Sequence, residues 1–326
     1  MGFINKIKEK KLPHFLLKLL LFLSIIFFLD FSIGSILKYW YYKQDSGLLY
    51  RATYAIDSTR AEVLIFGSST ANHHYSPGAF ESRTHLPFYN TGRDGNTIFY
   101  NYSILQGALK RYSPKIVILD LNRGEFKENP ESYDRISSLL PYYNNHPKIR
   151  SIIQLKSPYE KYKLLSKIYP FNSMLFTIAV GTTEYNKRRE YINDKEGFVP
   201  LNKVWKREIT TDTSHVKYGL DSNKTEVFKS FITNCVNSNV KLYIFVSPIF
   251  EKYTYQDQSI VIAQKIANEF KIPFYDFSGD TLFLNHIGLF ADVLHLNDKG
   301  AKIYSNKVVD KIIQEQNPNT FSSAIK

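Results

Sequence analysis

The strongest constraint on the fold is a short apolar run that ends abruptly in glycine and serine. The four apolar residues Val63–Phe66 are followed directly by Gly67, Ser68 and Ser69. Such a run is typical of a buried strand in a parallel sheet, and open α/β sheets bind their ligands at the carboxyl ends of the strands. A serine at this point either caps the next helix or acts as a nucleophile.

A serine nucleophile needs a base, and a suitable pair of residues lies near the other end of the sequence. Asp292 and His295 are three residues apart, just before a helical pattern over 298–314. An imidazole that is oriented by a carboxylate is the arrangement that activates a serine hydroxyl. The pair therefore favours a catalytic Ser69 over a simple helix cap.

Two further polar turns follow predicted strands. The first follows a short strand at 87–90 and contains Gly95, whose backbone N–H could be directed at an oxyanion. The second follows a strand at 115–121 and contains Asn122, which could donate a side-chain N–H to the same oxyanion. Ordinary turn chemistry is the alternative explanation for both stretches.

The alternation of apolar runs and amphipathic segments predicts an α/β fold with a parallel sheet of about five strands. We expect a three-layer α/β/α sandwich over 61–314, preceded by a linker at 43–60 and followed by a polar tail at 315–326. A two-domain organisation is allowed by the length but is not required. The strands are predicted at 63–66, 87–90, 115–121, 240–247 and 273–277, and the helices at 97–112, 223–237, 259–270 and 298–314.

The N-terminus predicts a membrane segment. Four lysines within the first 11 residues precede an almost wholly apolar stretch at 15–37. Lysines before a span favour a cytoplasmic N-terminus, so residues 1–42 read as a single-pass anchor and the rest as extracytoplasmic. A cleaved signal peptide is the alternative, because the small residues at 32–35 could suit a peptidase. The aromatic run Tyr39–Tyr42 favours a retained anchor.

The strand–helix rhythm disappears between about 126 and 215, in a region rich in tyrosine, asparagine and lysine. A long interruption of this kind is normally an insertion over the active-site edge, where it acts as a lid or a partner surface. The adjacent His73 and His74 are interpreted as surface or loop histidines, because two neighbouring histidines cannot both reach one metal from a helix or strand.

Composition excludes several classes of function. The formal charge is +12, but the basic residues are scattered and form no nucleic-acid-binding motif, so we expect no nucleic-acid partner. The single cysteine, Cys235, excludes an internal disulfide and a multi-cysteine metal site. No motif indicates a metal or a nucleotide cofactor, and none is expected.

These blocks resemble, in order and spacing, those of the SGNH/GDSL hydrolase superfamily, over about 55–125 and 220–314. The resemblance implies a flavodoxin-like fold. It makes Ser69 the nucleophile, with its N–H in an oxyanion hole together with Gly95 and the amide of Asn122. Asp292 and His295 match the last block, which Leu296 and Asn297 continue. The sequence departs from the family at Ser68, where many members have aspartate, and in the third block, whose asparagine would fall near Gly124.

The resemblance also implies a reaction through an acyl-serine. Water would make the protein an esterase, whereas a sugar hydroxyl would make it an O-acyltransferase. The anchored layout is similar to accessory proteins of alginate O-acetylation and teichoic-acid D-alanylation, which act with a multispanning membrane O-acyltransferase. We therefore expect an O-acyl, in particular O-acetyl, transferase of cell-envelope polysaccharide. The alternatives are a carbohydrate or lipid esterase, and a non-catalytic envelope binding protein that retains the fold.

Overall fold

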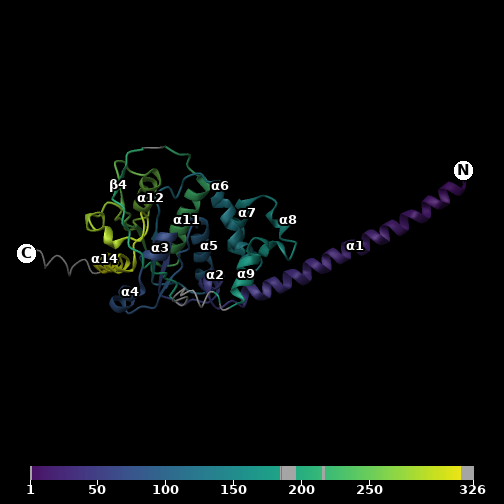
Figure 1. Ribbon diagram of the computed structural model, residues 1–326, viewed down its shortest axis with the longest axis horizontal. Helices are drawn as coiled ribbons and strands as arrows, with labels where there is room; N and C mark the ends of the chain where they lie inside the picture. Colours follow the sequence, from purple (N-terminus) through teal and green to yellow (C-terminus); the bar gives the residue numbers. More distant parts are fainter. Residues whose placement is uncertain (1, 184, 186–195, 215–216, 317–326) are drawn as a thin grey trace, which may run out of the picture.

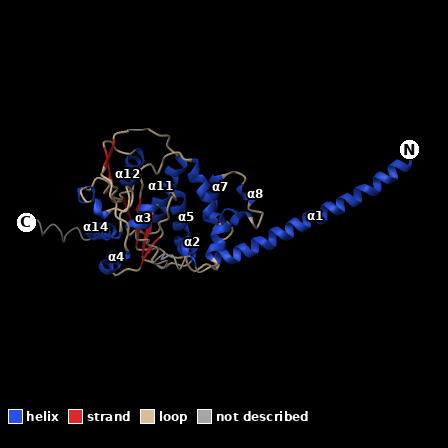
Figure 2. Ribbon diagram, in the orientation of Figure 1, coloured by secondary structure: helices blue, strands red, loops and turns tan. Residues whose placement is uncertain are grey.

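Five short apolar runs form one parallel sheet in the computed structural model, which describes residues 2–183, 185, 196–214 and 217–316. The strand order is β2-β1-β3-β5-β7, and helices surround the sheet (Figure 2). The predicted parallel sheet of five strands is therefore confirmed. The strands are β1 (Val63–Phe66), β2 (Phe88–Asn90), β3 (Ile116–Asp120), β5 (Lys241–Val246) and β7 (Phe274–Asp276).

The inner strand β1 contributes to two separate hydrophobic cores, one on each face of the sheet. Because successive side chains of a strand point to opposite faces, Leu64 and Phe66 belong to the first core, and Val63 and Ile65 to the second. The first core is completed by α2 (Gly47–Asp57), α5 (Ile98–Leu109), α11 (Ser222–Asn237) and α12 (Gln258–Glu269), and the second by α3 (Ser69–His74), α4 (Pro77–Thr84) and α14 (Asp298–Gln316).

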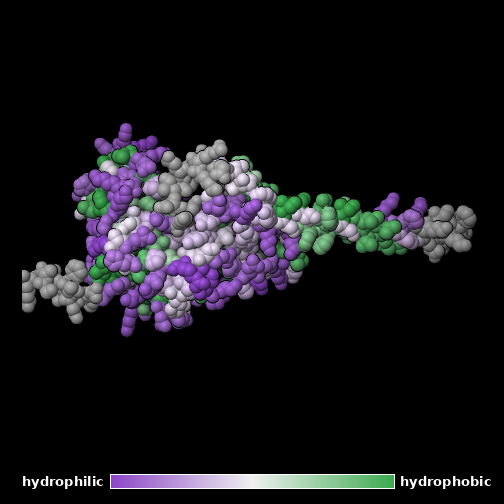
Figure 3. Space-filling view, turned by 90° about the horizontal axis from the view of Figure 1, so that it is seen from below, coloured by the Kyte–Doolittle hydropathy of each residue, from purple (hydrophilic) through white to green (hydrophobic). Residues whose placement is uncertain are grey.

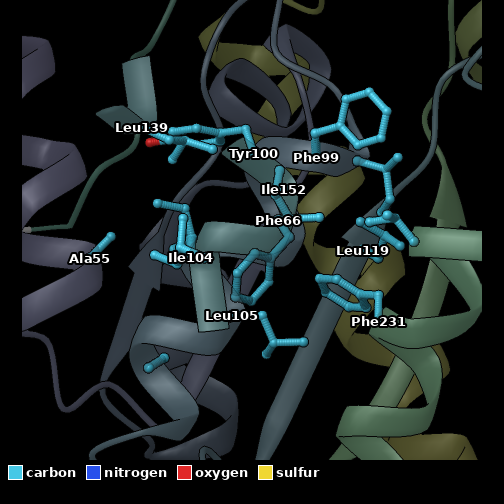
Figure 4. Close-up of a cluster of buried hydrophobic side chains, with 14 of the residues drawn as sticks. Ala55, Phe66, Phe99, Tyr100, Ile104, Leu105, Leu119, Leu139, Ile152 and Phe231 are labelled. Carbon is cyan, nitrogen blue, oxygen red and sulfur yellow. The ribbon is translucent and has the colours of Figure 1, made fainter. Parts of the chain in front are cut away.

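Figure 4 shows the centre of the first core. Phe66 of β1 and Leu119 of β3 lie there with Phe231 of α11, and the Phe66 and Phe231 rings are 5.3 Å apart. Leu139 and Ile152, from the region expected to be an insertion, lie in the same cluster. That region is therefore packed against the helices on one face of the sheet rather than held apart from it.

The stretch expected to be a polar linker, 43–60, instead contains helix α2, which is packed into the first core. Leu49, Ala52, Ala55 and Ile56 are each at most 1% exposed. The helix was missed because its buried face combines small and large apolar residues with polar residues between them, so the average composition is mixed.

A series of short helices runs through the described part of the region 126–215. They line one side of the globular part, and a separate two-stranded parallel sheet joins β4 to β6. Between Thr281 and Leu289, two short helical turns lead to the last helix. The tail at 317–326 lies outside the described residues. The elements are α6 (Pro130–Asp134), η1 (Arg135–Tyr142), η2 (Pro147–Ile149), α7 (Arg150–Lys156), α8 (Glu160–Lys163), η3 (Tyr169–Met174), α9 (Leu175–Gly181), β4 (Thr210–Asp212), β6 (Glu251–Tyr253), α13 (Thr281–Leu284) and η4 (Ile287–Leu289).

Helix α1 (Gly2–Tyr42) extends away from the globular part as one long rod (Figure 1). Its segment Lys11–Tyr42 contains a window with a mean hydropathy of 2.3 and is long and apolar enough to span a membrane. Figure 3 shows this segment as a band of hydrophobic surface beside a more polar globular part.

The C-terminal end of α1 is bound to the globular part. The Asp30 carboxylate accepts hydrogen bonds from the backbone N–H groups of Lys167, at 2.7 Å, and Ile168, at 3.3 Å. Tyr42 donates its hydroxyl to the Pro141 carbonyl at 2.9 Å. The end of the helix is therefore part of the folded domain rather than a free tether.

Candidate active site

Ser69 lies at the carboxyl end of β1, as the first residue of helix α3. The chain turns between the two elements at Gly67, whose φ of +149° is open to glycine and rarely adopted by other residues. A Cβ atom there would lie 2.7 Å from the Asp120 carbonyl oxygen. The turn therefore requires glycine, and it places Ser69 at a helix start, where a backbone N–H has no intrahelical acceptor.

His295 and Asp292 are held in a tight turn before α14. Asp292 Oδ1 accepts hydrogen bonds from the backbone N–H groups of Leu294, at 2.8 Å, and His295, at 2.9 Å. Asn297 accepts the Gly300 N–H at 3.0 Å and so caps the last helix. The turn thus fixes the carboxylate and the imidazole relative to the same helix end.

The three side chains form a continuous hydrogen-bonded series. Ser69 Oγ lies 2.7 Å from His295 Nε2, and His295 Nδ1 lies 2.9 Å from each carboxylate oxygen of Asp292. Because a carboxylate only accepts, we assign the proton to Nδ1, which leaves Nε2 free to accept the serine proton. Partial burial by itself would raise the pKa of Asp292. The hydrogen bond from His295 and the charge of that ring outweigh this effect, so the pKa of Asp292 is lowered overall. Asp292 therefore stays ionised beside the imidazole.

Of the two expected oxyanion-hole groups, Asn122 is bound to the helix that begins at Ser69, and Gly95 adjoins that helix only through its neighbour Asp94. Asn122 Oδ1 accepts the Thr70 hydroxyl at 2.7 Å. Gly95 has a φ of +68° and lies in a loop whose Asp94 accepts a hydrogen bond from Asn72 at 2.7 Å. Both groups therefore belong to the surroundings of the triad.

Asp120, the last residue of β3, lies at the centre of a buried hydroxyl cluster. Its carboxylate accepts hydrogen bonds from Thr70, from Tyr75 at 2.7 Å and from Ser247 at 2.6 Å. Burial raises the pKa of Asp120 to about 6, although these hydrogen bonds lower it. The cluster ties β3 and β5 to the helix that carries Ser69.

The raised pKa of Asp120 predicts a stability that depends on pH. A group with a higher pKa in the folded state stabilises below its unfolded pKa, and the stabilisation is lost as the pH rises through the folded pKa. We therefore expect the free energy of unfolding of the wild type to fall between pH 4 and 7 relative to Asp120→Asn. The difference should change by up to about 1.4 kcal/mol per pH unit. Urea pulse proteolysis of the full chain in detergent measures it, and parallel curves for the two proteins would contradict the prediction.

The interpretation of His73 and His74 as surface or loop histidines is wrong. Both lie on α3 and are buried, with 6% and 0% of their surface exposed. His74 Nε2 accepts the backbone N–H of Leu296 at 2.9 Å, next to His295. Burial lowers the pKa of His74 well below its usual range, which keeps the ring neutral as an acceptor. His74 and Leu296 are 222 residues apart in the chain, so no local sequence pattern could have predicted this hydrogen bond.

His73 connects the triad to the loop of Gly95. Its ring centroid lies 5.3 Å from that of His295, its Nδ1 is 2.6 Å from the Val199 carbonyl oxygen and its Nε2 is 3.3 Å from Asp94. The carboxylate–imidazole pair of Asp94 and His73 thus stands beside the pair of Asp292 and His295. Sequence analysis did not find this second pair.

A cleft of about 880 Å³ opens beside His73 and Asp94. Its walls come from both sides of the domain, because α3 and the loop after β2 face the short helices of the region 126–215. Four basic side chains contribute to the lining, namely Arg51, Arg93, Arg135 and Lys156. Residues Met174, Thr177 and Val180, at the α9 side, complete the far wall. The cleft thus extends from His73, whose ring lies next to that of His295, towards α9.

No cluster of three or more histidine, cysteine or acidic side chains that could hold a metal ion occurs within the described part of the chain. Cys235 is buried in the first core, and burial raises the pKa of its thiol.

Searches against known protein families and against curated proteins give no match for this chain.

Proposed function

We propose that the protein is a membrane-anchored SGNH-type serine enzyme that forms an acyl-serine at Ser69 and transfers the acyl group to cell-envelope polysaccharide. The observation that carries the proposal is the series Ser69–His295–Asp292, with contacts of 2.7 and 2.9 Å. When the five strands of the parallel sheet are numbered 1 to 5 along the chain, their order in the sheet is 2-1-3-4-5. This order, together with helices on both faces, supports a three-layer, flavodoxin-like arrangement.

The reaction follows from the positions of the protons. His295 Nε2 takes the proton of the Ser69 hydroxyl as the oxygen attacks an acyl carbonyl, and Asp292 stabilises the resulting imidazolium. The backbone N–H groups of Ser69 and Gly95, with the Asn122 amide, are the proposed donors to the oxyanion. His295 then returns the proton to the leaving group, and an acyl-serine remains. A second hydroxyl activated by His295 releases the acyl group.

The cleft supports transfer over hydrolysis as the second half of the reaction. It is large enough for several sugar residues, and it is lined by His73, whose ring centroid lies 5.3 Å from that of His295. Transfer to a sugar hydroxyl needs such a site, whereas transfer to water does not. An esterase that binds a glycan ester in the same cleft is the second candidate function.

The contacts of α1 support an uncleaved anchor with its N-terminus in the cytoplasm. Cleavage near residue 35 would remove Asp30 from the backbone N–H groups of Lys167 and Ile168. It would also remove Gly34, whose Cα lies so close to the Lys167 backbone that a side chain there would clash. The lysines before the span favour the orientation that exports the domain. A multispanning O-acyltransferase is the proposed source of the acyl group.

Covalent labelling and acyl transfer test the proposal. We expect a serine-directed fluorophosphonate to label the full chain in membranes at Ser69, and acetyl from p-nitrophenyl acetate to appear on an added envelope oligosaccharide. Acetate alone would identify an esterase. A folded protein that neither reacts with the probe nor cleaves the ester would contradict the enzyme and favour a binding protein.

A further inference from the structure

Exposed apolar side chains gather in the segment 157–181, which contains α8, η3 and α9. Leu165 and Phe176 are 77% and 82% exposed, which is more than any large apolar residue of the described part of α1. Tyr159, Tyr162 and Leu175 are also exposed. Soluble surfaces usually carry such residues singly, and a group of them marks a surface that contacts a partner. We call these five residues the apolar edge.

The apolar edge lies on the side of the domain from which α1 leaves, as the positions of α8 and α9 in Figure 1 show. The hydrogen bonds of Asp30 with Lys167 and Ile168 fix this part of the domain against α1, 12 residues before Tyr42. At 1.5 Å per residue, the domain reaches back along the helix by about 18 Å. The segment is therefore the part of the domain that projects furthest towards the apolar span.

The length of the remaining helix places this contact at the membrane surface. Residues 12–29, between the last lysine of the N-terminal cluster and Asp30, extend about 27 Å as a helix. A bilayer has a hydrocarbon core of about 30 Å. The Asp30 contact, and the apolar edge beside it, would then lie where the hydrocarbon meets the headgroups.

The chemistry of the segment suits that boundary. Tyrosines place a ring in the apolar region and a hydroxyl in the polar one, and lysines extend their charge to the headgroups. Lys161 and Lys167 are exposed, whereas Glu160 is buried and paired with Lys163 at 2.9 Å. With three lysines and one glutamate, the segment carries a net charge of +2, without an exposed acidic side chain. This pattern is that of an interfacial membrane contact, and anionic lipid would strengthen it.

We propose that the apolar edge inserts into the headgroup–acyl boundary of the membrane that α1 spans, as a second membrane contact. The proposal rests on the membrane placement of α1 given above, and not on the acyl chemistry. It has a consequence for substrate access, because α9 separates the membrane from the cleft. Met174 and Thr177 line the cleft, while Leu175 and Phe176 are exposed on the outer side. The cleft would then lie about one helix diameter, or roughly 10 Å, from the bilayer surface, within reach of a membrane-borne substrate.

Site-specific fluorescence in lipid vesicles tests the proposal. The full chain is reconstituted into vesicles of phosphatidylethanolamine and phosphatidylglycerol, with the environment-sensitive dye NBD attached at Leu165→Cys or Phe176→Cys. The native Cys235 is buried and adds little background. Val261→Cys, on α12, is the matched control, because Val261 is an exposed apolar residue, at 45%, outside the segment. Leu21→Cys reports whether α1 is in the bilayer.

We expect spin-labelled lipid to quench the dye at positions 165 and 176 several-fold more than at 261, and aqueous iodide to quench it several-fold less. Equal quenching at 165, 176 and 261 overturns the proposal, and it would assign the apolar edge to a protein partner. Quenching by lipid at 21 in that experiment would show that α1 still spans the membrane. Fluorophosphonate labelling of Ser69 in the same vesicles reports the acyl chemistry separately, so failure of the proposed reaction leaves the fluorescence result unaffected.

Discussion

Replacement of Ser69 by alanine is expected to abolish fluorophosphonate labelling and to lower p-nitrophenyl acetate cleavage by about 10⁴- to 10⁶-fold. His295→Ala should cost about as much, because the 2.7 Å contact between Ser69 Oγ and His295 Nε2 is the proposed route of the proton. Removing one member of such a unit removes its function, so the double variant should be no worse than either single variant. Steady-state rates of the full chain in detergent measure these effects.

Two matched controls make the result specific. Ser68→Ala removes the neighbouring hydroxyl without touching the hydrogen bond to His295 and should keep activity within about tenfold. His286→Ala removes an exposed histidine whose Nδ1 lies 2.7 Å from the Leu282 carbonyl oxygen, on another turn, and should leave the rate unchanged. Losses in Ser68→Ala that equal those in Ser69→Ala would contradict the assignment of the nucleophile.

Gly67→Ala is expected to destabilise the fold by about 4 kcal/mol or more and to remove the activity with it. The new Cβ would lie 2.6 Å from the Ala71 Cβ and 2.7 Å from the Asp120 carbonyl oxygen, and the φ of +149° is strained for alanine. Neither neighbour can move freely, because one is on α3 and the other is backbone of β3. Urea pulse proteolysis of the full chain measures the loss of stability.

Gly124→Ala is the control for the conformational part of this effect. Gly124 also has a positive φ, of +70°, but nothing lies within 4 Å of a Cβ added there. Its cost should be limited to the backbone strain, about 1 kcal/mol. If the two variants were equally stable, the close packing of β1, α3 and β3 around Gly67 would not be what fixes Ser69 at the strand end.

Much of the fold could be predicted because its central strands are short, wholly apolar runs bounded by glycine, proline or polar residues. The run at 63–66 is buried on both faces of the sheet, so all four of its residues are apolar. Such a continuous apolar run, ended by turn residues, is enough to predict a strand. Helix α2 was not predicted, although Leu49, Ala52 and Ile56 recur at helical spacing on its buried face, because two of its four buried apolar residues, Ala52 and Ala55, are small and give a weak hydrophobic signal. The burial of His73 and His74 also depends on contacts with distant chain segments.

The sequence by itself determined the apolar strands, the polar residues at their carboxyl ends, the membrane-length apolar segment and the identity of the three triad residues, because these depend on local pattern and side-chain chemistry. Only the tertiary structure decided that His295 contacts Ser69. It also decided that the Asp120 carboxylate accepts hydrogen bonds from the buried hydroxyls of Thr70, Tyr75 and Ser247. The packing of the region 126–215 against α1 and the helices on the sheet is a further result of the tertiary structure. Those contacts join residues far apart in the chain, and hydrophobic burial and hydrogen-bond satisfaction select them only once the whole domain has folded.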